Sequence, residues 1–361
     1  MTSPIKRVRG PFVATSYALG FIVLFLAVYI LNLAQHIVVP LVIAVFIWYL
    51  INAIARVLMN WHPGGKVIPR FFCFATAIGL LLLGVYGIFS LIKQNVALVI
   101  KAAPQYKERF DAITPKVMNL LGLDHIPTMS ELVKQIDLAD IITKSAGIFT
   151  GFTGTTVEVL FLTGFLLYEQ RYFDRKIAGM SNDRKGEEKF RHILTNIDFK
   201  IQRYIGVKTL VSTLAAIATY AILRFVGVDF AAFWALLAFF LHFIPYVGTF
   251  AAIALPSLMT LVQFSDMGTF VSVAVSLSVA LMLIGHILDP RLLGDMLNLS
   301  PICIIMSLAV WHAIWGVPGM FLAIPILAII VITLSQFEPT RPIAVLLSKS
   351  GVLEKGIRTK D

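Results

Sequence analysis

Charged residues are scarce in this sequence. Asp, Glu, Lys and Arg together make up 14% of its 361 residues, whereas hydrophobic residues make up 58%. Such a chain would be insoluble as a globular protein, because it has too few polar side chains to cover its apolar surface. Uncharged blocks recur along the chain, each long enough for a helix that crosses a membrane. The sequence therefore predicts an all-α, polytopic helical membrane protein that lies in a lipid bilayer.

Cysteine is nearly absent, and the motifs of membrane enzymes are missing. The two cysteines, Cys73 and Cys303, lie inside apolar blocks, which excludes a disulfide framework and a thiolate metal site. There is no "HExxH" motif and no Walker-type phosphate loop, and "LLGD" at 292–295 has leucine where an intramembrane aspartyl protease needs glycine. We therefore expect no enzymatic activity, no cofactor, no bound metal and no ATP-driven pumping by this chain alone.

Acidic residues are outnumbered by basic ones, which leaves a formal net charge of +10. The basic residues lie mainly in short segments beside apolar blocks, as the positive-inside rule requires of cytoplasmic loops. The charge excess therefore indicates membrane orientation, and we expect no nucleic-acid partner.

The N-terminal region, residues 1–92, contains three predicted spans at 12–31, 37–55 and 71–92. The first uncharged block is longer than the core of a signal peptide and lacks a small-residue cleavage site, so we expect it to remain as a span. Basic residues precede the first span and separate the second from the third, which places the N-terminus and this loop in the cytoplasm. These residues are Lys6, Arg7, Arg9, Arg56, Lys66 and Arg70.

Two polar segments flank the fourth predicted span, residues 146–168. Residues 93–145 carry an apolar stripe at helical spacing, which predicts an extracytoplasmic amphipathic helix that Pro115 kinks or interrupts. This helix could lie on the membrane surface, against another subunit or on its own neighbours. Residues 171–203 are the most basic part of the chain, so the region 146–206 is predicted to end in a cytoplasmic segment. The stripe consists of Ala103, Tyr106, Phe110, Ile113, Val117 and Leu120.

Residues 207–337 form the predicted transport core. After a fifth span at 207–223, the uncharged run 230–265 is too long for one span and too short for two, which take about 20 and over 40 residues. Pro245 lacks a backbone donor and Gly248 tolerates positive φ, so both interrupt a helix. The run therefore predicts a broken helix or a re-entrant hairpin, whose unpaired backbone groups must lie inside protein or beside water.

A second hairpin is predicted at 296–337, broken at the "GVPG" of 316–319, after a span at 267–288. The tail, residues 338–361, is then cytoplasmic, and two full spans would give the same sidedness. Both hairpins follow similar segments, "RFVGVDF" and "RLLGDML", and each has a histidine before its break and a proline after it. Their predicted orientations are opposite, which indicates an inverted repeat like those of secondary transporters; chance similarity between apolar segments is the alternative.

We expect a small polar solute to bind between the two breaks, where freed carbonyls and helix N-termini can receive it. Asp289 and Arg291 are predicted to form an inner gate, or else a helix end with a charge pair at the membrane interface. The two histidines could relay protons, or each could hydrogen-bond a neighbouring carbonyl. The candidate binding or gating residues are His242, Pro245, Tyr246, Gly248, Asp289, Pro290, Arg291, Gly294, His312, Gly316, Pro318 and Gly319.

Three motifs carry a resemblance to a known family. "FLHFIPYVGTFAAIALP", "LDPRLLGDMLNLSP" and "WGVPGMFLAIPILAI", in this order, resemble the C-terminal half of the autoinducer-2 exporter family of bacterial permeases. The match covers about residues 204–334, whereas the N-terminal half shares only the general layout. The resemblance implies an inner-membrane permease that forms a homo-oligomer. Its relatives include exporters of autoinducer-2 and proteins linked to sodium or lithium/proton antiport, and they often have Asn where His242 stands.

The sequence thus leaves three hypotheses for function. The first is a secondary transporter that exports a small polar solute, such as one like autoinducer-2, by alternating access. The second is a sodium (lithium)/proton antiporter, which needs an intramembrane group that exchanges a proton; the candidates are Glu158, Asp289, His242 and His312. The third is a non-transporting membrane scaffold or regulator that uses the basic segment.

Overall fold

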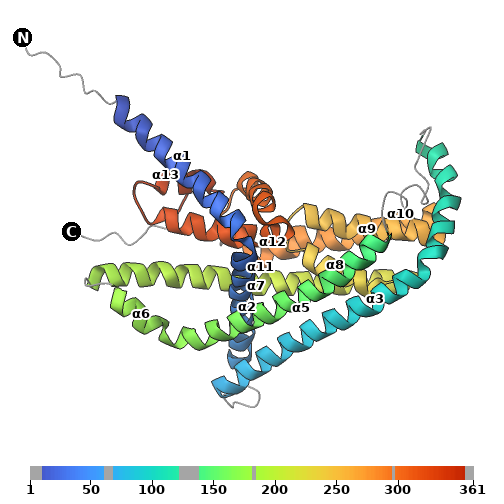
Figure 1. Cartoon of the computed structure of the whole chain (residues 1–361), viewed down its shortest axis with the longest axis horizontal. Coiled ribbons are helices and arrows are strands. Elements are labelled where there is room, and N and C mark those ends of the chain that lie inside the picture. The colour runs from blue at the N-terminus through green and yellow to red at the C-terminus, as the bar shows by residue number, and fades with distance from the viewer. Residues whose placement is uncertain (1–9, 61–67, 122–137, 181–183, 295–296, 354–361) are drawn as a thin grey trace, which may run out of the picture.

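Every regular element in the described part of the chain is a helix in the computed structural model (Figure 1). The sole strand-like contact there is an isolated bridge between Leu299 and Ser348. Among the described residues, six helices are long and apolar enough to cross a membrane. The predicted all-α, polytopic fold is therefore confirmed. The structure describes residues 10–60, 68–121, 138–180, 184–294 and 297–353.

Four long helices cover the four spans predicted in the N-terminal half. Helix α3 continues far beyond its apolar part, Arg70–Asn95, and its last turns bend away in Figure 1. We call residues 96–121 the α3 extension. After the fourth helix, the basic segment begins with the short elements η2 (Gln170–Tyr172) and α6 (Phe173–Met180). The four helices are α1 (Gly10–Leu33), α2 (Gln35–Asn60), α3 (Arg70–Leu121) and α5 (Leu138–Glu169).

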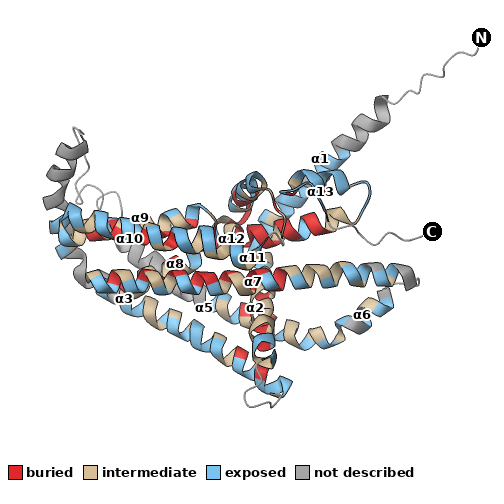
Figure 2. Ribbon diagram, turned by 180° about the vertical axis from the view of Figure 1, so that it is seen from behind, coloured by how far each residue is buried: buried red, intermediate tan, exposed pale blue. Residues whose placement is uncertain are grey.

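Helix α7 (Arg184–Val226) is the centre of the packing. Its 43 residues reach about 65 Å, so the helix passes from the basic segment through the fifth predicted span without a break. The buried residues gather along α7, α2 and α12 (Figure 2), whereas other helices expose large apolar side chains such as Phe71 and Leu83, as lipid-facing helices do. Helix α7 packs against α2, α8 (Ala231–Leu241), α10 (Met267–Leu283) and α12 (Pro301–Ser335).

The first predicted hairpin consists of α8 and α9 (Val247–Phe264). Its two ends meet, because the backbone N–H of Asp229 donates to Oε1 of Gln263 at 2.8 Å and Nε2 of Gln263 donates to the carbonyl of Gly227 at 3.0 Å. Figure 1 shows α8 and α9 side by side. The chain therefore enters and leaves this hairpin at the same end of the molecule.

The second predicted hairpin lies within α12. Gly316 interrupts this helix with φ 65° and ψ −141°. Oγ of Ser307 donates to the carbonyl of Ala323 at 3.1 Å, although a straight helix would separate these residues by about 24 Å. The two halves of α12 therefore fold against each other, and α13 (Arg341–Leu347) packs beside them.

The α3 extension joins the end of the molecule where the first hairpin opens. The hydroxyl of Tyr106 donates to Oδ2 of Asp229 at 2.5 Å, and Nη1 of Arg109 donates to the carbonyl of Gln263 at 2.7 Å. Burial, and then the hydrogen bond to Asp229, raise the pKa of Tyr106, so the hydroxyl stays a donor at physiological pH. Tyr106 is the one member of the predicted stripe whose side chain is described. The predicted interaction of this segment with its own neighbours is therefore present at Tyr106.

Replacing Tyr106 by Phe is expected to loosen the α3 extension, because the substitution removes the hydrogen bond to Asp229 and keeps the ring. A bond contributing about 1 kcal/mol implies roughly fivefold faster amide exchange in residues 96–121. Hydrogen–deuterium exchange measures this. Tyr86→Phe, on the exposed side of the same helix, is the matched control, and equal exchange in both variants would show that the contact carries no stability.

Segments that the positive-inside rule assigns to one side also lie together. Nη2 of Arg56, after the second predicted span, lies 3.3 Å from Oδ2 of Asp198 in the basic part of α7. Lys200 of this basic part lines one pocket with Lys349 and Ser350 of the predicted tail. Figure 1 places α6 and α13 (Arg341–Leu347) toward one end of the molecule and the α3 extension at the other. The described segments that were predicted to be cytoplasmic thus lie toward one end of the structure.

Candidate functional site

The first helix break leaves room for no side chain at Gly248. A β-carbon built there would lie 1.7 Å from the carbonyl oxygen of Leu241. A positive φ occurs in this break at Tyr246, at 62°, directly after Pro245, and not at Gly248. The tolerance of Gly248 for positive φ is therefore not used, and the close approach of two backbone segments is the reason that glycine is needed.

The second break repeats this arrangement. A β-carbon at Gly319 would lie 2.0 Å from the carbonyl oxygen of Trp311, and the positive φ falls on Gly316. In each hairpin the glycine abuts the carbonyl of the residue just before a histidine, His242 in the first and His312 in the second. This match supports the predicted repeat at the level of backbone geometry.

The two breaks meet in an apolar contact. The rings of Phe243 and Phe321 stack with centroids 4.4 Å apart, and Phe46 of α2 lies edge-on to both, at 5.8 and 5.1 Å. Beside them, Ile244 packs against Leu308 and other side chains of α12. The place where the solute was predicted to bind is therefore closed by aromatic and aliphatic side chains in this conformation.

The C-terminal end of α1 is hydrogen-bonded to the tip of the second hairpin. Nε1 of Trp315 donates to the carbonyl of Leu31 at 3.0 Å, and Nδ2 of Asn32 donates to the carbonyl of Ile314 at 3.2 Å. The bond from Asn32 satisfies the carbonyl of Ile314, which lacks its usual helical partner because Pro318, four residues later, has no N–H. The second hairpin thus has a polar anchor at its tip in addition to its apolar contacts.

A buried ion pair lies next to the first break. Nζ of Lys208 on α7 is 2.7 Å from Oδ2 of Asp289, and the two side chains are only 6% and 14% exposed. A π-helical turn, η3 (Ile284–Leu288), comes immediately before α11 (Asp289–Leu293). Such a turn inserts an extra residue and so changes the direction in which the following side chains point, often at functional sites.

His242 belongs to the same cluster. A β-carbon at Gly285 of η3 would lie 3.6 Å from Cε1 of His242, and the imidazole interacts electrostatically with both Lys208 and Asp289. Tyr204, one turn before Lys208 on α7, also interacts electrostatically with Asp289. The ion pair is therefore surrounded by further polar side chains from α7 and from the first break. Ser212 lies one helical turn after Lys208 on α7. We call Tyr204, Lys208, Ser212, His242 and Asp289 the polar cluster.

Several polar atoms of the cluster are buried without a hydrogen-bond partner in the described part of the chain. Buried polar groups in proteins are nearly always hydrogen-bonded, so a group of exceptions points to a place where polar molecules bind. The cluster can therefore hydrogen-bond a polar solute in a region that is otherwise apolar. These atoms are the Tyr204 hydroxyl, the Ser212 hydroxyl, both ring nitrogens of His242 and Oδ1 of Asp289.

Asp289 and Arg291, the two residues of the predicted inner gate, do not pair with each other in the described part of the chain. Asp289 pairs with Lys208, whereas Arg291 lies on an exposed face of α11 with Pro290 and Gly294 nearby. On a helix, residues two apart point in different directions, so the two side chains could not both face the core. The inner charge pair exists, but its cation comes from α7.

The other predicted site residues divide between the breaks and the surface. His242 and Asp289 come together in the polar cluster. Gly248, Gly316 and Gly319 shape the breaks. Exposed positions are those of Tyr246, Pro318, His312 and Glu158.

Sequence reasoning missed Lys208 and Tyr204. Lys208 lies near the start of the fifth predicted span, where a lysine is usually interpreted as a charged residue at the membrane–water interface. One signal could have found them, because Tyr204, Lys208 and Ser212 are spaced four residues apart and so share one face of a helix. A polar stripe in a membrane helix indicates a buried functional face.

The known proteins to which this chain is similar are described as transport proteins. The family described as "AI-2E family transporter" matches residues 19–338. The chain is 26% identical to a "Putative transport protein" of Borreliella burgdorferi, over 93% of this chain and 91% of that protein. It is 25% identical to "AI-2 transport protein TqsA" of Escherichia coli, over 96% and 98%. It is 24% identical to "Putative transport protein YhhT" of the same species, over 88% and 89%.

Proposed function

Because the chain belongs to the AI-2E transporter family, we propose that it is a secondary permease that exports a small polar solute by alternating access. Its place is the bacterial inner membrane, as a multi-pass protein with both termini in the cytoplasm. A solute like autoinducer-2 is the finer proposal, which the description of the relative TqsA supports. The homo-oligomer implied by the resemblance is part of the same proposal.

One observation carries this proposal: two broken hairpins meet at an apolar contact directly beside a buried polar cluster. The first hairpin opens toward the α3 extension, and the second opens toward the tail. Opposed hairpins that meet within the bilayer are the arrangement in which one repeat rocks against the other around a fixed site. Separation of Phe243 from Phe321 would then open a path along the polar cluster.

Efflux from proteoliposomes tests the proposal. Vesicles holding the purified chain are loaded with a panel of labelled solutes: autoinducer-2, glycerol, glycerol 3-phosphate and lactate. At least one solute is expected to leave faster than from protein-free vesicles. If none does, the non-transporting scaffold or regulator becomes the better account of this chain.

The proposed orientation predicts how single cysteines react with an impermeant maleimide in intact cells. With Cys73 and Cys303 replaced by Ala, Ser350→Cys should stay unlabelled, because the tail faces the cytoplasm. Met267→Cys, on an exposed residue at the opposite end, is the positive control and should react. The reverse pattern would mean that the whole topology is inverted. A cysteine at Asn182 in the basic segment, a position that lies outside the described residues, should also stay unlabelled.

Cation/proton antiport is the second candidate, and the buried carboxylate of Asp289 favours it, because a cation stripped of water needs carboxylate oxygen. An antiporter would acidify or alkalinise vesicles when a sodium gradient is applied. We expect no such signal from the parent chain. A robust signal that Asp289→Asn or Glu158→Gln removes would place antiport first.

A further inference from the structure

We propose that two separate gates close the polar cluster, one toward each end of the molecule, and that a peripheral segment holds each gate shut. The inference rests on the proposed permease function, because it assigns the two barriers that alternating access requires. Each gate consists of one hairpin packed on one part of α7. The α3 extension holds the first hairpin in place, and the tail holds the second.

The order of residues along α7 shows where the two barriers lie. Tyr204, Lys208 and Ser212 place the polar cluster near the middle of this helix. The buried apolar residues on either side of them pack against different hairpins, those at 201–205 against the second and Ala215 against the first. A solute in the cluster would therefore meet an apolar barrier in both directions.

The second hairpin and the tail close the cluster on the tail side. Ile201, Tyr204 and Ile205 of α7 are buried in one apolar cluster with the second half of α12 and with α13. Tyr204 belongs to this apolar cluster, and its hydroxyl is also one of the unpartnered atoms of the polar cluster. Movement of α12 away from α7 would therefore expose the polar cluster from this side. The other buried members are Leu299, Ile324, Leu327, Ala328, Val331 and Ala344.

The first hairpin closes the cluster on the side of the α3 extension. Ala215, three residues after Ser212 on α7, is buried against Ala238 of α8, Ala252 of α9 and Leu281 of α10. Small side chains such as these alanines let membrane helices approach closely. Movement of the first hairpin away from α7 would therefore expose Ser212 from this side.

The backbone is strained where the hairpins begin and end. Among the described residues, every non-glycine residue with positive φ lies at such a place or at the first break. Phe230 at 59° and Ser265 at 52° bound the first hairpin, Tyr246 lies at its break, and Asn298 at 45° lies just before the second hairpin. Strained residues of this kind persist where surrounding contacts hold them, and they cluster at switch regions. The contacts at these joints therefore control whether a hairpin can move.

The α3 extension contacts both ends of the first hairpin. The hydroxyl of Tyr106 donates to Asp229, and the ring of Tyr106 lies 6.2 Å from that of Phe230, between centroids. Arg109 donates to the carbonyl of Gln263 near the other end. Tyr106 and Arg109 are three residues apart, so one face of the helix supplies both contacts. We call these two residues the first latch. Its hydrogen bonds are exposed, so it can open without global unfolding.

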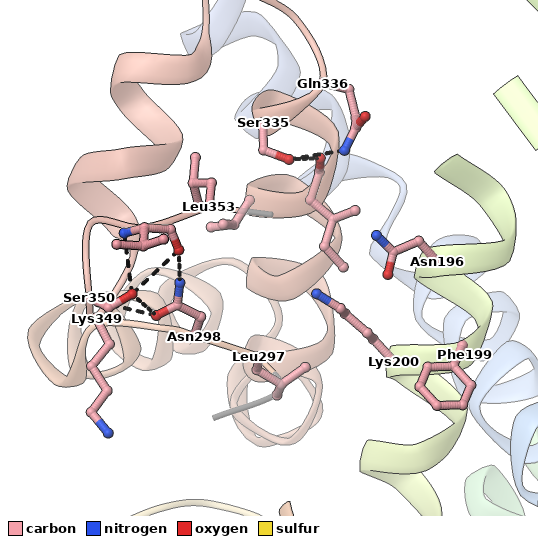
Figure 3. A pocket seen from close by; sticks show the side chains of 13 residues that line it. Asn196, Phe199, Lys200, Leu297, Asn298, Ser335, Gln336, Lys349, Ser350 and Leu353 are labelled. Carbon is pink, nitrogen blue, oxygen red and sulfur yellow. Dashed lines mark hydrogen bonds between the residues drawn. The ribbon is translucent and has the colours of Figure 1, made fainter. Parts of the chain in front are cut away.

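The tail contacts the start of the second hairpin. The backbone N–H of Lys349 donates to the carbonyl of Asn298 at 3.0 Å. Oδ1 of Asn298 accepts from the N–H and the hydroxyl of Ser350 at 3.1 and 3.0 Å, and its Nδ2 donates to the carbonyl of Val352 at 2.8 Å. Figure 3 shows the bonds around Asn298. We call Asn298 and its partners in the tail the second latch, because they hold the residue at which φ is positive.

Modification of a cysteine at Ser212 tests for two separate gates. Ser212 is fully buried, so in a chain with Cys73 and Cys303 replaced by Ala, Ser212→Cys should react slowly with a charged methanethiosulfonate that does not cross the bilayer. Intact cells present one side of the protein and inverted vesicles the other. Labelling of Met267→Cys and Ser350→Cys identifies which side is which.

Each latch variant should speed this reaction from one side only. Tyr106→Phe combined with Arg109→Gln removes the side-chain bonds of the first latch and should raise the rate by about fivefold or more from the side of the α3 extension. Asn298→Gly removes the side-chain bonds of the second latch, while glycine keeps the positive φ without strain. It should raise the rate by a similar factor from the tail side. Tyr86→Phe, on an exposed face of α3, is the control and should change neither rate.

Hydrogen–deuterium exchange of the chain with its native Ser212 gives an independent measurement. The first-latch variant should speed amide exchange in α8 and α9 and leave α12 unchanged, and Asn298→Gly should do the reverse. Faster exchange in the α3 extension or the tail alone would overturn the inference, because the latch would then hold no hairpin. Equal effects of one variant on both hairpins, or equal effects on labelling from both sides, would also overturn it.

Neither measurement uses a transported solute, so failure of the gates and failure of the permease can be told apart. Side-specific labelling without efflux of any tested solute would leave the two gates standing and count against the permease. Efflux without side-specific labelling would refute the gates alone.

Discussion

Asp289→Asn is expected to abolish transport and to destabilise the protein by about 3–5 kcal/mol. The substitution leaves the ammonium of Lys208 buried without a counter-charge, and breaking a buried pair at one partner is far more damaging than replacing both. The loss of stability is measured by thermal unfolding in detergent, and the loss of transport by efflux from vesicles.

The double variant Lys208→Gln/Asp289→Asn is the matched comparison. Because it removes both charges, it should recover most of the lost stability and still fail to transport. Asp289→Asn, Lys208→Gln and the double variant form a double-mutant cycle. The coupling energy between the two positions in this cycle should exceed about 1 kcal/mol. If Asp289→Asn alone were as stable and as active as the parent, the ion pair would contribute neither to stability nor to transport. Arg291 would then again be a candidate for the gate.

Gly248→Ala and Gly319→Ala are each expected to abolish transport and to lower the yield of folded protein. Even the smallest side chain would overlap a backbone carbonyl, at 1.7 Å in the first break and 2.0 Å in the second. Neither carbonyl belongs to a flexible side chain, so a hairpin must move apart to make room. Overpacking of this kind costs about 1–3 kcal/mol or more.

Gly79→Ala and Gly164→Ala are the controls for the glycine variants. Both glycines lie in long helices, α3 and α5, and a β-carbon at either would meet nothing within 4 Å. Alanine there should leave folding and transport unchanged, or should stabilise the helix slightly. Full transport by both Gly248→Ala and Gly319→Ala would mean that the breaks are ordinary kinks.

The spans were predictable from the sequence because each depends on local composition. An uncharged block long enough to cross a membrane has few other ways to satisfy its backbone, so α1, α2 and α10 follow the blocks closely. The hairpin at 230–265 was predictable for the same reason, since its length fits neither one span nor two. The continuation of α3 and α7 beyond their apolar parts was harder to foresee, because it depends on docking to other elements.

Only some residues of the candidate site could be predicted from the sequence. His242, Asp289 and the break glycines stand out in the sequence as unusual residues in apolar surroundings. The partner of Asp289 did not, because Lys208 is 81 residues away and only tertiary packing brings the two together. The same limit applies to the break geometry: the sequence indicates that Gly248 is special, but the neighbour that makes it so, the carbonyl of Leu241, appears only when the hairpin is folded.

The closed contact between the breaks is the feature on which the account depends. Phe243 and Phe321 stack across it, and Phe46 covers both rings. If the hairpins part during each transport cycle, this contact must open, and fixing it must stop transport. If they do not part, the polar cluster beside it has another role.

A cross-link between the breaks tests this central claim most directly. In a chain with Cys73 and Cys303 replaced by Ala, Phe243→Cys and Phe321→Cys place one thiol on each side of the contact in which the two rings now stack with centroids 4.4 Å apart. A dimaleimide with an internal disulfide joins the two thiols, and efflux is measured from vesicles that hold the cross-linked protein and again after reduction. The account predicts no efflux while the cross-link is intact and recovery when it is reduced. Undiminished efflux from fully cross-linked protein would contradict it.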